Sequence, residues 1–199
     1  MNADTAASAT RPSTAADTRA RILAAASELF YSHGIRATSA DRVIEQVGLT
    51  KVTFYRHFRT KSDLVVAYLQ AQADAERGWI QNLRRTGDPA GSLRAIAAGL
   101  GAASCSPGFR GCAFINAAAE FARDDDPVRL AVDAHRRWML GELASIAAEA
   151  KVGDAEAAAR QLMMLRDGAM VSGYLDGPAA VAASLEAAFL SIVGVAAPA

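Results

Sequence analysis

Two short helical segments separated by a glycine constrain the fold of this chain more than any other feature of its sequence. Ser39 can cap a helix over residues 40–47, Gly48 opens a tight turn, and Thr50 can cap a second helix that ends near Phe58. A longer segment with apolar residues at helical spacing precedes them. Two short helices joined by a glycine-containing turn after a longer helix are the helix-turn-helix arrangement.

The rest of the chain is also predicted to be helical. Its apolar fraction is 52%, much of it alanine, which is the best helix former, whereas the β-branched and aromatic residues that strands prefer are scarce. We therefore expect an all-α fold of about nine helices and no strand. The seven further helices are predicted over 17–33, 61–86, 89–104, 112–123, 127–151, 154–175 and 178–195. Residues 1–15 are rich in Ala, Ser and Thr, lack periodicity, and are expected to form a disordered arm.

The sequence lacks the signatures of a membrane or secreted protein. No apolar run approaches the roughly 20 residues that span a bilayer. The N-terminal stretch has no basic region followed by an apolar one, as a secretory signal would. The two cysteines, Cys105 and Cys112, are too few for a disulfide scaffold and suit a reducing compartment. We expect a cytoplasmic protein without a membrane partner.

The charge of the chain is unevenly distributed, although the net charge is zero. Nine basic and four acidic residues lie between Arg11 and Lys61, whereas twelve basic and sixteen acidic residues follow. A basic first quarter is typical of a segment that contacts a polyanion. Chance clustering on a solvated surface explains the charge alone equally well.

Helical phase gives the second short helix a surface suited to the DNA major groove. Phe54 and Phe58 are four residues apart and define a buried edge, so Val52 and Arg56 point nearly opposite. Arginine can bind guanine bidentately, and apolar methyl groups can contact thymine methyls, while neighbouring polar residues hold phosphates. The predicted DNA contacts are Thr38, Ser39, Arg42, Thr50, Lys51, Val52, Thr53, Tyr55, Arg56, His57 and Lys61. Taken singly, Tyr55 and His57 fit interhelical packing equally well.

The stretch ATSADRVIEQVGLTKVTFYRHFRTKSDLVVAYL closely resembles the signature of the TetR/AcrR family of transcriptional regulators. The resemblance covers about residues 16–66. Two departures are Val47, where the family usually has Ala, and Val52, where Gly or Ala is common. Because Val52 faces the groove, the operator sequence cannot be transferred from a relative. The matching positions are Gly34, Thr38, Ser39, Gly48, Thr53, Tyr55, His57, Phe58, Lys61 and Leu64.

This resemblance implies an all-helical protein in which three N-terminal helices bind double-stranded DNA and about six C-terminal helices bind a small-molecule effector and dimerise. The domains would be a DNA-binding domain over 16–62 and a ligand-binding and dimerisation domain over 63–199. The effector itself is not implied, because families of this kind vary most in their C-terminal half.

Larger apolar groups in the C-terminal half predict a pocket for an apolar or aromatic ligand, with Asn116, His135 or Arg166 supplying polar contacts. Most of these side chains fit an ordinary helical core equally well. No spacing of His, Cys and carboxylates typical of a metal site occurs, and no cofactor is predicted. The predicted ligand contacts are Trp79, Leu83, Leu100, Phe109, Cys112, Asn116, His135, Trp138, Met139, Met163, Arg166, Met170 and Tyr174.

The segment GFRGCAFINAAAEF resembles one found in a subset of these regulators, and it places Cys112 in the first turn of a helix. The helix dipole and Arg110 would both favour a reactive thiolate there. One hypothesis is therefore an electrophile or oxidant sensor with Cys105 as a resolving partner. The alternative is a small cysteine packed beneath the loop.

The last two predicted helices carry apolar stripes that favour a C2 homodimer through a four-helix bundle. A twofold dimer predicts a palindromic operator. The predicted interface residues are Leu162, Leu165, Ala169, Leu185, Phe189 and Ile192.

Together these patterns predict a ligand-responsive regulator, a repressor by the family's usual sign, that releases its operator when an effector binds. An enzyme is disfavoured, because the sequence contains no nucleophile elbow and no phosphate loop. A DNA-binding protein without regulation is disfavoured, because most of the chain is neither basic nor needed to contact DNA.

Overall fold

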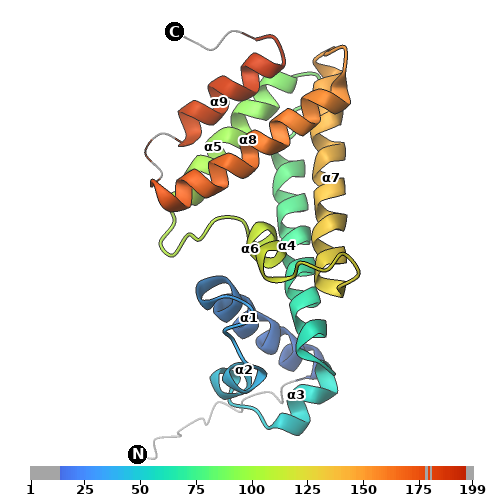
Figure 1. Ribbon diagram of the computed structural model, residues 1–199, viewed down its shortest axis with the longest axis vertical. Coiled ribbons are helices and arrows are strands. Elements are labelled where there is room, and N and C mark those ends of the chain that lie inside the picture. The colour runs from blue at the N-terminus through green and yellow to red at the C-terminus, as the bar shows by residue number, and fades with distance from the viewer. Residues whose placement is uncertain (1–13, 178, 180, 196–199) are drawn as a thin grey trace, which may run out of the picture.

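The computed structural model describes residues 14–177, 179 and 181–195, and these residues form nine α-helices and no strand (Figure 1). The predicted all-helical fold is confirmed. The predicted arm lies mostly on residues 1–13, outside the described part, as does residue 178, where the last helix was expected to begin. The helices are α1 (Ala15–His33), α2 (Ala40–Val47), α3 (Lys51–His57), α4 (Lys61–Leu83), α5 (Pro89–Ser104), α6 (Ala113–Glu120), α7 (Pro127–Glu149), α8 (Ala155–Leu175) and α9 (Val181–Ile192).

Side-chain caps fix the beginnings of the N-terminal helices. The Ser39 hydroxyl accepts a hydrogen bond from the amide of Arg42 at 3.1 Å, and the Thr50 hydroxyl accepts one from Thr53 at 3.2 Å. Thr60 and Asp63 form a reciprocal capping box at the start of α4. These caps satisfy amide groups that have no partner inside the helix, so the turns between α2, α3 and α4 are set locally.

The glycine between α2 and α3 is required by its backbone conformation. Gly48 has φ +70° and ψ 41°, the left-handed region that disfavours side chains. Its amide donates to the carbonyls of Ile44 and Glu45, which closes α2. The predicted turn is thereby confirmed.

The first three helices pack together around one apolar cluster, which is continuous with the start of α4. Phe54 and Phe58 are both buried, as their spacing predicted, and Ile22 and Val43 are fully buried beside them. Burying aromatic and branched side chains stabilises such a small unit, because each removes a large apolar area from water.

The remaining helices form a larger bundle above the first three (Figure 1). Helix α4 runs from the small N-terminal group into this bundle and lies beside α7, while α5 packs along α9 and α7 along α8. At Gly101 a side chain would come within 2.5 Å of Ala182, so glycine permits the close approach of α5 and α9. The short helix α6 lies beside α4, between the bundle and α1.

Neither a membrane-spanning helix nor a group of metal-ligating side chains occurs among the described residues. None of their helices is long and apolar enough to cross a membrane. No three His, Cys, Asp or Glu side chains in that part of the chain are grouped so that they could hold a metal ion.

Candidate nucleic-acid interface and ligand cavity

Helix α3 presents an exposed face that consists of the residues predicted from its phase. Val52 is 65% exposed and Tyr55 45% exposed, whereas Phe54 on the opposite side is completely buried. Arg56 is also exposed. An exposed valine beside an arginine is unusual on a solvated helix but suits a groove that offers both methyl groups and hydrogen-bond acceptors.

The polar residues flanking α3 make contacts that hold them near this face. The Lys51 ammonium lies 2.9 Å from an oxygen of Asp41, and its hydrogen bond to Asp41 raises the pKa of Lys51. The Thr53 and Thr50 hydroxyls lie 3.0 Å apart. Arg42 contacts Nε2 of His33 at 3.1 Å. His57, half-buried, occupies the last position of α3.

One of the predicted DNA contacts, Thr38, does not lie as expected, and another, Lys61, lies at a junction between helices. Thr38 is completely buried, and its hydroxyl donates to the Gly34 carbonyl at 2.9 Å, so it cannot reach a phosphate. Lys61 is partly buried, and burial lowers the pKa of Lys61. The charge of Glu120 raises this pKa and that of Arg36 lowers it. Lys61 therefore lies at the junction with α6. The sequence pattern predicted the position of Thr38 in the chain but not the direction of its side chain, whereas a DNA contact of Lys61 stays a prediction.

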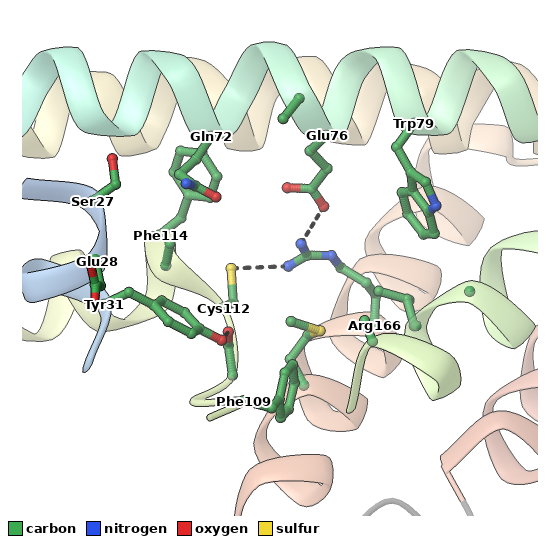
Figure 2. Close-up of a pocket in the computed structure, with 17 residues that line it drawn as sticks. Ser27, Glu28, Tyr31, Gln72, Glu76, Trp79, Phe109, Cys112, Phe114 and Arg166 are labelled. Atoms are coloured by element: carbon green, nitrogen blue, oxygen red, sulfur yellow. Dashed lines mark hydrogen bonds and ion pairs between the residues drawn. The ribbon is translucent and has the colours of Figure 1, made fainter. Parts of the chain in front are cut away.

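A cavity of about 540 Å³ lies between α1, α4, α5, α6 and α8 (Figure 2). Trp79, Leu100, Phe109, Cys112, Arg166 and Met170 line it, as the sequence predicted. Its walls also include three residues of α1 that were not predicted, namely Ser27, Glu28 and Tyr31, and further residues that include Gln72, Glu76 and Phe114. The sequence offered no signal for the α1 residues, because α1 reads as part of the N-terminal domain alone.

Seven residues predicted to bind ligand do not line the cavity: Leu83, Asn116, His135, Trp138, Met139, Met163 and Tyr174. Met139 and Met163 are buried in the helical core, and Tyr174 is exposed beneath the Arg110 guanidinium. Asn116 donates to the Arg110 carbonyl at 2.9 Å. His135 stacks on Phe114, with ring centroids 3.6 Å apart, and so lies beside the cavity-lining Phe114.

A buried network of charged side chains surrounds Arg166. Arg166 is 4% exposed; its Nη2 donates to Oε1 of Glu76 at 2.5 Å, and its Nη1 to Sγ of Cys112 at 3.4 Å and to Oδ1 of Asp167 at 3.1 Å. Figure 2 shows the guanidinium between Glu76 and Cys112. Asp167 in turn accepts from Arg136 at 2.7 Å. The positive charges of the two arginines are therefore balanced by the negative charges of Glu76 and Asp167.

The pKa shifts follow from this arrangement. Burial raises the pKa of Glu76, but His135 and Arg166 outweigh burial, and the pKa of Glu76 lies below its usual value. His135 Nε2 lies 3.0 Å from Oε2 of Glu76 without the alignment of a good hydrogen bond. Burial lowers the pKa of Arg166, whereas Cys112 and Glu76 raise it, and the net shift is upward. Both partners of the ion pair are charged at neutral pH.

Cys112 is buried and is the N-cap of α6, one position before the first turn in which the sequence placed it. Cys105 is exposed at the end of α5. The preceding Gly111 has φ +74°, and a side chain there would come within 3.2 Å of the Met170 carbonyl. Glycine therefore allows the loop to lie against α8 and bring the thiol to Arg166.

The surface of α8 and α9 corrects part of the predicted dimer interface. Leu162, Leu185 and Phe189 are buried inside the protomer, and Leu165, Ala169 and Ile192 are partly buried. The exposed apolar residues of α8 are Met164, Val171, Tyr174 and Leu175. A hollow of about 440 Å³ lies between α8 and α9 on this side. The three buried residues therefore pack within the protomer, whereas an interface role of Leu165, Ala169 and Ile192 stays a prediction.

Comparison with known proteins identifies relatives of the whole fold and of its N-terminal part. Residues 22–68 match the family model described as bacterial regulatory proteins, tetR family. The crystal structure of SCO4454, a TetR-family transcriptional regulator from Streptomyces coelicolor, is 38% identical, covers 90% of this chain and 95% of that chain, and superposes with a TM-score of 0.84. The reduced form of Escherichia coli NemR shares the fold at 20% identity, with a TM-score of 0.78 and coverage of 88% of this chain and 97% of that chain.

Among curated proteins, the HTH-type transcriptional activator FasR of Mycolicibacterium smegmatis is 38% identical over 78 residues, which are 39% of this chain and 36% of FasR. The HTH-type transcriptional regulator TtgR of Pseudomonas putida is 39% identical over 57 residues, 29% of this chain and 27% of TtgR. The match spans about a third of the length of these curated relatives.

Proposed function

Because the chain belongs to the TetR family of helix-turn-helix transcriptional regulators and is not an enzyme, we propose that it represses transcription. It binds a palindromic operator as a homodimer. A small apolar or aromatic effector releases it from the operator. In this proposal residues 16–62 bind DNA, and residues 63–199 bind the effector and dimerise. Repression is the sign that is usual in the family.

The exposed face of α3 is the proposed reading surface. Val52, Thr53 and Arg56 contact base edges, because they point away from the buried Phe54. Phosphates are held by polar residues at the helix ends, which fix position without reading sequence. These residues are Ser39, Arg42, Thr50, Lys51, Tyr55, His57 and Lys61.

The observation that carries the effector proposal is the cavity of about 540 Å³, whose walls are mostly apolar and aromatic and include the buried Arg166. This volume and lining are typical of small-molecule sites. An effector that prefers one conformer of the dimer over another by several kcal/mol, on the order of 5, can shift it from mostly DNA-bound to mostly free.

The proposed dimer interface is the exposed apolar face of α8 with the small residues of α9. Met164 is 65% and Leu175 69% exposed, and Gly168 and Val171 lie between them at helical spacing. A patch of this kind that pairs with its own copy across a twofold axis forms a four-helix bundle. The two α3 helices then face DNA together.

The test begins with duplexes that the protein selects from a random-sequence pool. We expect an inverted repeat, bound with an affinity that falls about tenfold or more when a neutral aromatic compound such as 2-naphthol fills the cavity. A Trp138→Phe variant leaves Trp79 as the fluorescent reporter of cavity binding. Quenching of Trp79 without any loss of duplex affinity would count against effector-driven release.

A second candidate function, a sensor of electrophiles, is favoured by the contact of 3.4 Å between Nη1 of Arg166 and Sγ of Cys112. A guanidinium stabilises a thiolate, which is the nucleophile. The thiolate sulfur would add to the β-carbon of an α,β-unsaturated carbonyl compound, forming a carbon–sulfur bond as the carbon–carbon π bond breaks, and the resulting enolate would take up a proton from water at its α-carbon. Loss of DNA release by such a compound in Cys112→Ser, but not in Cys105→Ser, supports this candidate, whereas an unchanged response excludes it.

A further inference from the structure

The cavity is closed on one side by the DNA-binding domain itself. Ser27, Glu28 and Tyr31 lie on one face of α1 and line the cavity, opposite Trp79 of α4 (Figure 2). A molecule that fills the cavity therefore contacts both domains directly. The effect of such a molecule on DNA binding depends on the contacts that hold α1 against the ligand-binding and dimerisation domain.

The phenol of Tyr31 links α1 to the loop before α6. Its hydroxyl donates to the Gly111 carbonyl at 2.9 Å and accepts from the Arg110 amide at 2.9 Å. Burial raises the pKa of Tyr31, so the hydroxyl keeps its proton and can donate at neutral pH. The Arg110 guanidinium also donates to the Ser32 carbonyl at 2.5 Å.

The other end of α6 is joined to the DNA-binding domain as well. The Glu120 carboxylate accepts hydrogen bonds from the amides of Ile35 at 2.9 Å and Arg36 at 2.5 Å, just after α1. Hydrogen bonds to a carboxylate are stronger than those between neutral groups. Helix α6 has eight residues and is about 12 Å long. Hydrogen bonds therefore join the segments at both ends of this short helix to the C-terminal end of α1 and the residues that follow it.

The same segment faces the cavity between these two attachments. The cavity wall here consists of Gly111, Cys112, Ala113 and Phe114, and the sulfur of Cys112 accepts a hydrogen bond from Arg166. Any displacement of this segment by an occupant is transmitted to Tyr31 and to the backbone after α1. Helix α1 packs on α2, so its orientation affects where α3 lies relative to DNA.

The charges around the cavity also restrict its occupant. Arg166 is paired with Glu76, and Arg136 with Asp167, so the buried network carries no surplus charge. An anionic ligand would lose hydration without gaining a free counter-charge there, because both arginines are paired and Glu28 on the cavity wall is itself a carboxylate. Aromatic side chains at both ends, Tyr31 and Trp79, favour a flat apolar molecule.

We propose that the effector is an aromatic molecule without a negative charge that lies against Tyr31, and that its contact with Tyr31 and the Gly111–Phe114 segment is what changes the position of α1. This inference rests on the proposed function, in which the cavity holds the effector. Tyr31 is here a positioning residue, because it couples binding of a ligand in the cavity to the position of the DNA-binding domain.

Two dyes that share a ring system test the charge of the ligand. N-phenyl-1-naphthylamine is neutral, and 1-anilinonaphthalene-8-sulfonate adds one negative charge; both fluoresce more strongly in apolar surroundings. We expect the neutral dye to bind the full-length protein about tenfold or more tightly than the sulfonate. Equal binding, or no binding of the neutral dye, would overturn the assignment of an aromatic ligand without a negative charge.

A Tyr31→Phe variant tests the role of the phenol, with Tyr174→Phe as the matched control, because Tyr174 also contacts Arg110 but lies outside the cavity. Saturating neutral dye should weaken duplex binding about tenfold or more in the wild type and in the control. In Tyr31→Phe this change should fall below about threefold while dye affinity stays within about threefold. The same loss of duplex affinity in all three proteins would overturn the proposal.

Hydrogen exchange without DNA separates this inference from the proposed function. Dye binding should alter exchange of the amides of residues 31–36 and 110–114 in the wild type and much less in Tyr31→Phe. Altered exchange with unchanged duplex affinity would reject effector-driven release but keep the contact at Tyr31. Unchanged exchange in these segments of the wild type, with dye bound, would reject the contact itself.

Discussion

Arg166 on α8 and Glu76 on α4 form an ion pair across the cavity wall, with Nη2 and Oε1 2.5 Å apart. Arg166 is almost completely buried, and the Glu76 side chain is 17% exposed. The pair joins the helix that extends from the DNA-binding domain to the helix proposed to dimerise. It is therefore a structural link and part of the ligand site at the same time.

Removing the charge of Glu76 should destabilise the protein strongly. Glu76→Gln keeps the shape but leaves the buried guanidinium with one carboxylate fewer, which costs on the order of 3 kcal/mol. Urea unfolding followed by circular dichroism measures the loss. Asp74→Asn is the matched control, since Asp74 lies on the same helix in an exposed pair with Arg77 and should contribute less than about 1 kcal/mol. Equal losses in the two variants would contradict the buried pair.

The contribution of Glu76 should depend on pH in one direction. Its folded pKa lies below the value of 4.5 that an unperturbed glutamate has, so ionised Glu76 stabilises the folded state above about pH 4.5. That contribution is lost as the pH falls through the lowered folded pKa. The difference in unfolding free energy between the wild type and Glu76→Gln should thus be full at neutral pH and shrink below about pH 4.5. A difference that stays constant down to pH 3 would contradict the assignment.

Much of the DNA-binding domain could be predicted because its signals are local. Ser39, Gly48, Thr50 and the capping box at Thr60 each act on the backbone within a few residues, and all lie as expected. The family pattern supplied the rest of the domain.

The cavity and the dimer face were less predictable, because they depend on tertiary packing. Tyr31 reaches the cavity only through contacts with residues about 80 positions away in the sequence. Phe189 belongs to a regular stripe, but both sides of α9 are apolar or small, and periodicity does not say which side packs inward. Thr38 was misplaced for a similar reason, since a hydroxyl next to a cap fits either the surface or an internal hydrogen bond.

Thr38 should affect stability and not DNA contact. In Thr38→Val the hydrogen bond to the Gly34 carbonyl is lost, which costs about 1 kcal/mol of unfolding free energy. The dependence of duplex affinity on salt should be unchanged, whereas Arg42→Ala should lower the slope by about one ion. A reduced salt slope in Thr38→Val would show that the residue does contact a phosphate.

Two substitutions on α8 and α9 should differ in whether they abolish dimerisation or folding. Val171→Asp, on the exposed face of α8, should give folded monomers, because a charge on each partner would be buried at the interface. Phe189→Asp should unfold the protomer, since Phe189 is completely buried within it. Sedimentation equilibrium together with circular dichroism distinguishes these results. Arg160→Ala on an exposed part of α8 serves as the control, and a stable dimer of Val171→Asp would exclude this face.

In the proposed function, α3 reads DNA through the face that carries Val52 and Arg56, and duplex binding of Arg56→Ala tests this role. On the duplex selected by the wild type, this variant should bind with about 1–3 kcal/mol less affinity and lose its preference at one base position of each half-site. Arg85→Ala, an exposed arginine far from α3 in the sequence, should bind as the wild type does. Wild-type affinity and base preference in Arg56→Ala would contradict this role.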